Sequence, residues 1–379
     1  MEKMSIVIIG AGIGGLTAGI ILKGLGYRVR IYESAPEIRP VGAGIAIANN
    51  AMQVYESIGL AGKITHAGHR ISRMVISDHT FREISGVDLT SFEKRYGVSN
   101  IAIHRAALQE LLAAEVTEEL VLARKLAGVT RGRGKGWELF FEDGDRVYAD
   151  LLIGADGIHS VVRSACFESA PVLDAGQRCW RGVCDNPFGN RYLNQAMEAW
   201  GAGKRFGFVS IDTQKVYWYA VINAGIPHAP ETNLETLYSE FHPDTAQLIR
   251  MTPPETLHYS SIQQLKPIPK WQKQQVCLLG DAAHAMTPNL GQGACQAIED
   301  AYALGKLLAG GLNPADAFSR YEKVRRRRVN AIVERSRIMG KISHLENRTA
   351  INLRNFMMRL SPPGLFRMQM SELFDIDYL

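Results

Sequence analysis

The sequence has little of what marks several protein classes. Among its 379 residues, no apolar run approaches the roughly 18 residues that a membrane-spanning helix requires. The N-terminal apolar run, Ile6–Ile9, passes directly into glycines, which does not fit a signal peptide. The five cysteines are few and odd in number, so no disulfide framework is predicted. These absences favour a cytoplasmic protein without integral membrane association.

A large excess of charge of one sign is also absent. The 43 Lys and Arg residues stand against 38 Asp and Glu residues, which gives a net charge of +5. Most of the excess lies in Arg325–Arg328, inside a predicted helix over Ala315–Ile342. We expect these arginines to form a helix face that is solvated or lies against the cofactor domain described below. Nucleic-acid-binding proteins usually concentrate such charge on one face, so no nucleic-acid partner is predicted. Hydrophobic residues make up 46% of the chain, enough for a large buried core.

The first 33 residues carry the strongest signal. The glycines Gly10, Gly12 and Gly15 fit the pattern G-x-G-x-x-G within the run Gly10-Ala11-Gly12-Ile13-Gly14-Gly15. Predicted elements surround this run: a buried strand over Ser5–Ile9, a helix over Leu16–Leu25 and a second strand over Arg28–Tyr32. An acid, Glu33, follows the last glycine of the motif by 18 residues. This is the context in which the pattern binds a dinucleotide.

Each residue of the motif has a physical role. Gly10 permits the tight turn, Gly12 lets the backbone approach a pyrophosphate, and Gly15 lets helix and strand pack closely. The diphosphate would lie at the helix N-terminus, where unpaired N–H groups favour negative charge. Glu33 would accept hydrogen bonds from a ribose 2′-hydroxyl and repel a 2′-phosphate, so the motif predicts FAD or NAD.

The rest of the chain predicts an α/β protein with a Rossmann-like cofactor domain built from discontinuous segments. Strands are also expected over Ile71–Asp78, Trp137–Glu142, Arg146–Ile153 and Val276–Leu279, and a helix over Arg105–Ala114. Strand patterns at Arg205–Ile211 and Val216–Ile222 indicate an inserted β-rich substrate domain. We assign residues 1–70, 98–175 and 270–340 to the cofactor domain, 71–97 and 176–269 to the substrate domain, and 341–379 to a helical C-terminal segment. A second G-x-G-x-x-G after a strand is absent, so no separate nicotinamide domain is expected.

Two further segments have the same strand–loop–helix character. In the first, Asp150–Arg163, a strand runs into the turn Asp156-Gly157 and then a helix. In the second, Cys277–Asp300, a strand ends at Gly280-Asp281, and the loop Pro288-Asn289-Leu290-Gly291-Gln292-Gly293 leads into a helix. An acid after a strand end can hold a ribose or ribityl hydroxyl, and a glycine-rich loop at a helix N-terminus can direct N–H groups to an oxyanion or a flavin carbonyl.

This ordered set resembles the three fingerprints of the single-component FAD-dependent aromatic hydroxylases, the para-hydroxybenzoate hydroxylase-like monooxygenases. Over nearly the whole chain, the sequence is most similar to the salicylate hydroxylase, urate hydroxylase and zeaxanthin epoxidase types. A glycine-rich loop from Arg39 to Ile45 is also expected to meet the ligand closely. The resemblance implies FAD-binding roles for Gly10, Gly12, Ile13, Gly14, Gly15, Glu33, Gly44, Arg105, Asp156, Gly157, Asp281, Pro288, Asn289, Gly291, Gln292 and Gly293.

The resemblance also implies a reaction. NAD(P)H would reduce the FAD, and O₂ would form a flavin C4a-hydroperoxide that hydroxylates a small aromatic or heteroaromatic substrate. Arg205 and Tyr217 occupy positions that resemble catalytic positions in the urate hydroxylases, and together with Asn289 they are the predicted catalytic residues. Those enzymes carry an aspartate where this chain has Asn289, so urate is disfavoured as the substrate. The sequence contains no nucleophile triad and no cluster with metal-ligand spacing, and the chain would act as a monomer or homodimer.

Other functions stay open at this point. A flavin epoxidase with a non-aromatic substrate would share the fold, and a reductase or oxidase would bind FAD without transferring oxygen. The spacing of Cys179 and Cys184 is that of a flavin disulfide reductase, but the pair falls more than 160 residues after the glycine motif, so no redox role is expected. The tail Phe356–Leu379 is rich in Met, Leu and Phe and could lie on a membrane surface, although a packed C-terminus is favoured.

Overall fold

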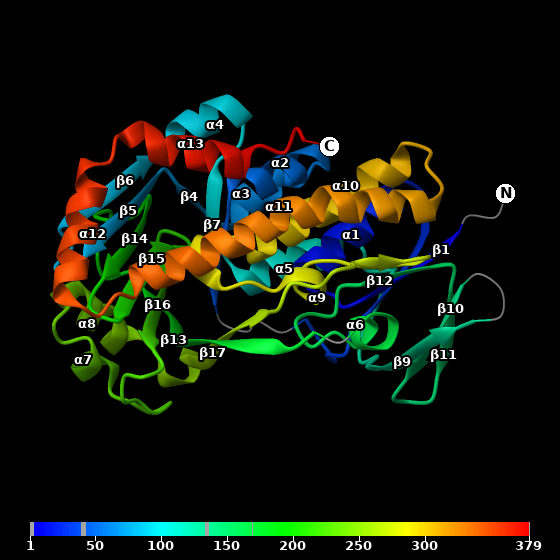
Figure 1. The fold of residues 1–379 in the computed structure, drawn as a ribbon, viewed down its shortest axis with the longest axis horizontal. Coiled ribbons are helices and arrows are strands. Elements are labelled where there is room, and N and C mark those ends of the chain that lie inside the picture. The colour runs from blue at the N-terminus through cyan, green and yellow to red at the C-terminus, as the bar shows by residue number, and fades with distance from the viewer. Residues whose placement is uncertain (1–3, 39–42, 133–135, 169, 379) are drawn as a thin grey trace.

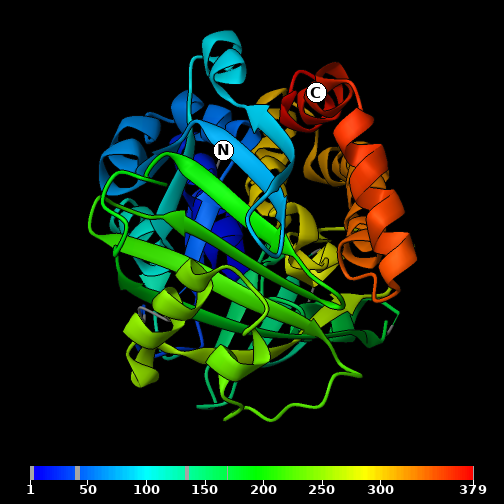
Figure 2. The ribbon, with the colours of Figure 1, turned by 90° about the vertical axis from the view of Figure 1, so that its left-hand side faces the viewer.

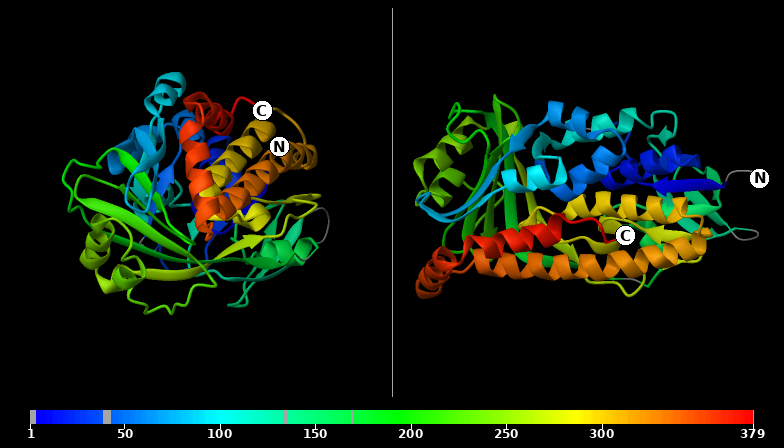
Figure 3. Two further views of the ribbon diagram at one scale, coloured as in Figure 1. Left: turned by 60° about the vertical axis from the view of Figure 1, so that its left-hand side comes forward. Right: turned by 90° about the horizontal axis from the view of Figure 1, so that it is seen from above.

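A computed structural model describes residues 4–38, 43–132, 136–168 and 170–378. Its two larger sheets lie at opposite ends of the molecule, and the long helix α11 (Pro314–Ser343) runs from one end to the other (Figure 1). Seen from above, α11 extends along one side of the whole described chain (Figure 3). The helix begins at a strong start signal, since the Asn313 side chain accepts a hydrogen bond from the Asp316 N–H and Pro314 follows the cap.

The first large sheet forms around the N-terminal strand. Its strands, in spatial order, are β18 (Gln272–Lys273), β19 (Val276–Leu278), β12 (Leu151–Gly154), β1 (Ser5–Ile9), β2 (Arg28–Tyr32) and β8 (Leu120–Val121). All neighbours pair in parallel except β18 and β19. The central strands are short apolar runs buried on both faces, as parallel sheets covered by helices require.

One predicted strand, Arg146–Ile153, is wrong as a single element. It divides into β11 (Arg146–Ala149) and β12, which belong to different sheets. Asp150 lies at the break, where its Oδ2 accepts hydrogen bonds from the Ser5 N–H and the Ser5 hydroxyl, both at 2.8 Å. An acidic side chain therefore aligns the start of β12 with the start of β1, which the apolar pattern alone could not reveal.

The second large sheet is assembled from two distant parts of the chain. Its strands, in spatial order, are β17 (His258–Leu265), β13 (Val172–Asp185), β16 (Lys215–Asn223), β15 (Lys204–Ser210), β14 (Gln195–Trp200), β5 (Arg73–Asp78) and β6 (Glu83–Asp88). Every pair is antiparallel except β14 and β5 (Figure 2). The strand β13 begins at Val172, within the range assigned to the cofactor domain, because it continues through a bulge between Asp174 and Arg178.

Alternation along these strands gives the second sheet two different faces. The outer face buries an aromatic core that includes Trp180, Phe206 and Trp218, covered by the helices α7 (Leu234–Leu237) and α8 (Pro243–Met251). The inner face carries polar side chains, among them Arg205 and Tyr217, toward the first sheet. Cys179 and Cys184 point to opposite faces of β13, so they cannot form the redox pair considered above.

The remaining elements are two small sheets and the other helices. The small sheets are β11–β10–β9, with β10 (Trp137–Phe141) and β9 (Leu126–Arg131), and β3–β7–β4, with β3 (Gly44–Ile47), β7 (Asn100–His104) and β4 (His69–Ile71). The helices are α1 (Ile13–Gly24), α2 (Asn49–Ser57), α3 (Ala61–Ala67), α4 (Thr90–Tyr96), α5 (Arg105–Ala114), α6 (Val161–Cys166), α9 (Asp281–His284), α10 (Gly293–Ala309), α12 (Arg348–Leu360) and α13 (Pro363–Phe374), with 3₁₀ turns η1 (Pro254–Thr256) and η2 (Pro288–Leu290). Among the described helices, none is both long and apolar enough to cross a bilayer.

The predicted fold class is confirmed. The protein is an α/β structure with a discontinuous Rossmann-like part, a β-rich insertion and a helical C-terminus. The arginines of the run Arg325–Arg328 do not share one environment. Arg327 is exposed, whereas Arg325 is fully buried against α10. The exact domain limits stay a prediction.

Candidate active site

The glycine-rich turn connects β1 to α1 at the carboxyl edge of the first sheet. Gly10 adopts φ 102°, and a side chain there would clash with the Ala155 carbonyl, while one at Gly15 would clash with the Gly10 carbonyl. By contrast, a Cβ built on Gly12 meets nothing within 4 Å among the described residues. Gly12 is also the N-cap of α1, so the turn leaves open space directly beside a helix N-terminus. This is the geometry that a bound diphosphate needs.

The carboxylate of Glu33 lies against this turn. It accepts hydrogen bonds from the Ala11 N–H at 2.7 Å and from the Ala35 N–H at 2.9 Å. The predicted loop residues Arg39, Pro40, Val41 and Gly42 lie outside the described residues. Gly44, at the end of that loop, begins β3.

A second helix N-terminus points to the same region. After β19 the chain turns at Gly280 (φ 61°), places the exposed Asp281 at the start of α9, and passes through Pro288 and Gly291 (φ 63°) into α10. Cβ atoms built on Gly291 and Gly293 meet no described atom within 4 Å. A Cβ at Gly14 would clash with Leu279 and Ala297, so this glycine lets α1 and α10 pack closely, and its predicted contact with the cofactor stays a prediction.

Buried charges hold the Gly280 loop in place. Asp300 of α10 accepts hydrogen bonds from the Gly280 N–H at 3.0 Å, His284 Nε2 at 2.6 Å and Arg325 Nε at 2.7 Å. Although burial opposes ionisation, the charges of His284 and Arg325 hold the pKa of Asp300 at about 2. Arg325 also donates to Glu299, at 2.6 Å. His284 therefore serves this loop rather than a reacting substrate.

The Asp156-Gly157 turn is tied to the same loop. One oxygen of Asp156, Oδ2, accepts from the N–H groups of Val161 at 2.7 Å and Val162 at 3.1 Å, so it caps α6. Burial raises the pKa of this carboxyl group. Arg163, which the motif analysis did not single out, donates to the Ala282 carbonyl at 2.9 Å. Arg163 thus ties the Asp156-Gly157 segment to the loop after β19, whereas direct contact of Asp156 with a cofactor stays a prediction.

Arg205 of the second sheet contacts Asn289, which lies in the loop between α9 and α10 (the α10 loop). Arg205 is 2% exposed, and its Nη2 donates to Asn289 Oδ1. The amide of Asn289 donates to Thr287 Oγ1 and to the Ser336 carbonyl, both at 2.9 Å. Because a carbonyl only accepts, the NH₂ group must face Ser336 and the oxygen must face Arg205. Gly340 leaves the room, since a Cβ there would clash with the Asn289 amide.

Tyr217 lies on the same inner face, further along the sheet. Its ring packs directly on Gly44, where a side chain would clash with it. Burial raises the pKa of the Tyr217 hydroxyl, against the opposing charges of Arg181 and Arg105. Arg105, the exposed first residue of α5, donates its backbone N–H to the Ala43 carbonyl at 2.9 Å. Tyr217, predicted for the substrate side, therefore lies beside Gly44 and Arg105, which are predicted to bind the cofactor.

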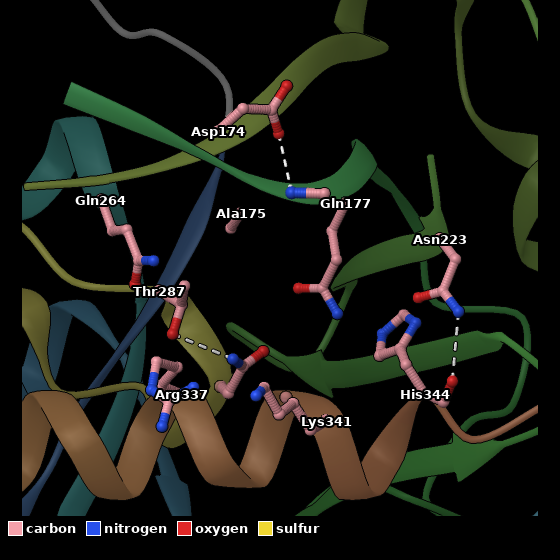
Figure 4. A pocket seen from close by; sticks show the side chains of 12 residues that line it. Asp174, Ala175, Gln177, Asn223, Gln264, Thr287, Arg337, Lys341 and His344 are labelled. Carbon is pink, nitrogen blue, oxygen red and sulfur yellow. Dashed lines mark hydrogen bonds between the residues drawn. The ribbon is translucent and has the colours of Figure 1, made fainter. Parts of the chain in front are cut away.

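A cavity of about 390 Å³ lies beside α11 (Figure 4), and Asn289, the partner of Arg205, is among its lining residues. Its polar lining comes from the second sheet, the loop before α10 and the end of α11, and includes Gln177, Asn223, Gln264, Thr287, Asn289, Arg337, Lys341 and His344. His344, 5% exposed, was not predicted from the sequence, since a lone histidine just beyond a helix end gives no pattern.

The proton position on His344 follows from its partner. The ring Nδ1 lies 3.2 Å from the Gly203 carbonyl, so Nδ1 carries the hydrogen and Nε2 is the acceptor. Burial, together with the Arg205 charge, lowers the pKa of His344 to about 3, which keeps the ring neutral. Within the described part of the chain, neither His344 Nε2 nor Arg205 Nε has a hydrogen-bond partner. A buried acceptor and a buried donor are thus left for a ligand.

Comparison with known sequences decides the family. The family described as the FAD binding domain matches residues 3–336. The chain belongs to this family. Its relatives include aurachin C monooxygenase/isomerase of Stigmatella aurantiaca, 38% identical over 363 residues and 94% of each chain. The 2-heptyl-3-hydroxy-4(1H)-quinolone synthase of Pseudomonas aeruginosa strain UCBPP-PA14 is 31% identical over 388 residues and 98% of each chain.

A solved structure agrees with these sequence relationships. The crystal structure of Klebsiella pneumoniae HpxO complexed with FAD and uric acid superposes with a TM-score of 0.90 at 26% identity, covering 98% of this chain and 96% of that chain. The resemblance to FAD-dependent monooxygenases, and the prediction that the chain is such an enzyme, are confirmed at the level of the family.

The described residues fit FAD, the cofactor of this family. The open space beside Gly12, Gly291 and Gly293 lies at two adjacent helix N-termini, which suits a diphosphate at one and a flavin ring at the other. Across the described ranges, no three His, Cys, Asp or Glu side chains gather as a metal site would require.

Proposed function

We propose that this protein is an FAD-dependent monooxygenase that uses NAD(P)H and O₂ to hydroxylate a planar nitrogen heteroaromatic compound of the 4-quinolone class. The relative of Pseudomonas is named as a synthase of a hydroxylated 4(1H)-quinolone, that of Stigmatella is named as a monooxygenase, and both align over nearly the entire chain. The single observation that carries the choice is the unpaired buried donor and acceptor, Arg205 Nε and His344 Nε2. A ring with one N–H group and one carbonyl or enolate oxygen would offer the complementary acceptor and donor.

The environment of Tyr217 favours a substrate with an apolar substituent over a purine. An apolar cluster that includes Val209, Ile211 and Ile332 packs beside Tyr217, with Met286 and Leu290 from the α10 loop against it. Urate offers only polar edges, whereas an alkyl or isoprenoid chain on a quinolone would bury apolar area against such side chains. Asn289, which replaces the aspartate of the urate hydroxylases, points to the same conclusion.

Bound FAD would accept a hydride from NAD(P)H and activate O₂ for transfer to the substrate. The turn at Gly12, the α1 N-terminus and Glu33 would hold its ADP half, and Asp281, Pro288, Gly291, Gln292 and Gly293 its ribityl chain and ring. Arg105 and Gly44 would contact the same cofactor.

The chain's own side chains would then orient the substrate. Arg205 donates to the developing enolate oxygen, and Asn289 keeps the guanidinium in place. His344 accepts the ring N–H but does not remove its proton, because a group with a pKa of about 3 is a weak base at neutral pH. Tyr217 offers its ring face to the planar substrate. Buried walls exclude water, which limits loss of oxygen as hydrogen peroxide.

The test is turnover by the flavin-loaded protein with 2-heptyl-4(1H)-quinolone, 2-methyl-4(1H)-quinolone and urate. We expect NADH or NADPH oxidation to accelerate most with the long-chain quinolone, and ¹⁸O from labelled O₂ to enter the product. Unlabelled product, or hydrogen peroxide alone with every compound, would move the protein to the oxidases or reductases.

A pair of variants tests the placement of the substrate. Arg205→Gln should raise the substrate KM by about ten- to a hundredfold, the value of a hydrogen bond to a charged group. Flavin content should stay unchanged. Lys204→Gln is the matched control, because Lys204 is the adjacent residue of β15 and bonds instead to the Leu237 carbonyl and Glu240.

A further inference from the structure

The helix α12 presents an apolar face to solvent. Leu353, Phe356, Met357 and Leu360 are 58%, 60%, 60% and 66% exposed, and they follow the i, i+3, i+4, i+7 spacing of one helix face. A surface helix of a globular protein usually directs that face to the core. In α12 the arrangement is reversed.

Polar contacts hold the reversed orientation. On the inward face the Arg354 guanidinium lies 4.8 Å from the centroid of the Trp200 ring and donates to the Ile342 carbonyl at 2.9 Å. Asn355, also buried, accepts from Arg354. The side chain of Asn347 caps the helix by accepting from the Ala350 N–H at 3.0 Å. These contacts fix α12 so that the apolar side chains stay outside.

The apolar surface continues on both neighbouring helices. Ile338 and Ile342 of α11 and Met368 of α13 are also exposed. All three helices meet at the end of the molecule farthest from the first sheet, with α12 on its outer edge (Figures 1 and 3). The view onto the second sheet shows α12 beside that sheet with its flank open to solvent (Figure 2).

The chain segment that carries most of this surface has charges of one sign. Between Asn347 and Gln369 the sequence contains four arginines and no acidic residue. Of these, Arg354 is buried and Arg359 pairs with Asp78 at 3.4 Å, whereas Arg348 and Arg367 are exposed, with Arg367 near enough to Asp88 of β6 for the two charges to interact. An apolar helix face bordered by arginines matches the interface of a bilayer that contains anionic lipids.

We propose that the outward face of α12, with Ile338, Ile342 and Met368, docks on an anionic membrane surface. The apolar side chains would enter the boundary between headgroups and acyl chains, and Arg348 and Arg367 would bind lipid phosphates. A second copy of this chain fits less well, because a twofold contact of this surface would bring the exposed arginines of both copies into one interface.

Docking would also place the cavity close to the bilayer. Ile338 and Ile342 lie next in sequence to Arg337 and Lys341, which line the cavity together with His344, the residue that follows α11. A quinolone with an alkyl chain partitions into membranes, so the enzyme would collect its substrate there. This last step rests on the proposed function, whereas docking itself does not.

The experiment is flotation of the flavin-loaded protein with vesicles of phosphatidylethanolamine and phosphatidylglycerol, and with vesicles of phosphatidylcholine alone. We expect binding to the anionic vesicles that weakens as salt rises. The double variant Phe356→Ser/Leu360→Ser should bind at least tenfold less, and Arg348→Glu/Arg367→Glu should lose the preference for anionic lipid. The matched control, Leu25→Ser/Met251→Ser, changes two exposed apolar residues elsewhere and should bind like the wild type.

Several results would overturn the proposal. Among them are failure of the wild-type protein to float with anionic vesicles and equal loss in the control variant. A third is a dimer in analytical ultracentrifugation that only the Phe356→Ser/Leu360→Ser variant loses, which would assign the surface to a second copy. Flavin content and Tm verify that each variant is folded. Since flotation requires no turnover, its outcome is independent of whether the protein hydroxylates a quinolone.

Discussion

At the scale of single residues, Asn289 explains a departure from the urate hydroxylases. Its amide donates to Thr287 and to the Ser336 carbonyl while its oxygen accepts from Arg205. A carboxylate has no hydrogen to give to Ser336, so aspartate would leave two acceptors facing each other. The sequence motif identified the position, but its partners come from β15 and α11, which no spacing rule connects to it.

Gly340 makes this arrangement possible, and its substitution is our first prediction. The methyl group of Gly340→Ala would displace the Asn289 amide. We expect a loss of about 1–3 kcal/mol in the free energy of unfolding, typical of overpacking, and more hydrogen peroxide per NAD(P)H oxidised. Flavin content should not change. Gly62→Ala, in a helix where the added methyl meets no described atom within 4 Å, is the control.

His344 gives a prediction for pH. Its pKa falls from 6.5 to about 3 on folding, so below pH 6.5 the unfolded chain binds a proton that the folded protein does not. Stability therefore decreases as the pH falls from 6.5 toward 3, by about 1.4 kcal/mol per pH unit from this group.

In His344→Gln that contribution is absent. Denaturant unfolding at pH 6.5 and pH 5 should show a smaller decrease for the variant than for the wild type, with a difference of about 2 kcal/mol. His66→Gln removes an exposed histidine and should retain the wild-type slope. Parallel slopes for wild type and His344→Gln would mean that His344 is protonated in the folded protein.

At the scale of elements, the parts with complete local signals were predictable. The strands β1 and β2 and the helix α5 begin and end where their patterns indicate, and α11 extends only one residue beyond each predicted end. Apolar runs, glycine turns and a capping asparagine define these elements locally. The reversed orientation of α12 could not be predicted, because periodicity identifies an apolar face but not the side to which tertiary contacts turn it.

The contact between α10 and α11 shows why a charge run is ambiguous. Arg325 is buried and bonds to Asp300, Glu299 and the Gln296 carbonyl, and the hydroxyl of Tyr378 lies against it. Only the helix register decides that this arginine, rather than Arg327, turns inward. The partners lie on α10, about 25 residues earlier in the chain.

We predict that Arg325→Met lowers the free energy of unfolding by about 3–5 kcal/mol. The substitution would leave two buried carboxylates without their main cation, and such losses are large. Arg327→Met removes the same charge from an exposed position of the same helix and should change stability little. Thermal unfolding of both variants measures the difference.

At the scale of the whole molecule, cofactor and fold should depend on each other. FAD would bridge the N-termini of α1 and α10 and the loop before β3, which belong to distant segments of the chain. A ligand at 100 times its Kd stabilises the folded state by about 2.7 kcal/mol. We therefore expect FAD to raise the Tm of the apoprotein by several degrees.

Gly12→Val should abolish this rise, because its side chain would occupy the open space where the diphosphate lies. Gly128→Val adds the same atoms to β9, where the first of them meets no described neighbour within 4 Å, and should leave the FAD-dependent shift intact. Differential scanning fluorimetry with and without FAD provides the comparison. A full shift in Gly12→Val would place the cofactor elsewhere.

The pairing of β5 with β14 has a consequence during synthesis on the ribosome. Arg73 aligns with Gln195, and β6 ends at Asp88, so the hairpin β5–β6 leaves the exit tunnel about 110 residues before its partner strand β14 does. At roughly 5–20 residues per second, translation of that interval takes on the order of ten seconds. Throughout that time the nascent hairpin presents an unpaired strand edge, the kind of surface to which trigger-factor-like chaperones and aggregating neighbours both have access. The yield of correctly folded enzyme should therefore respond to translation speed between codons 90 and 195 more than to codon choice after the sheet is complete.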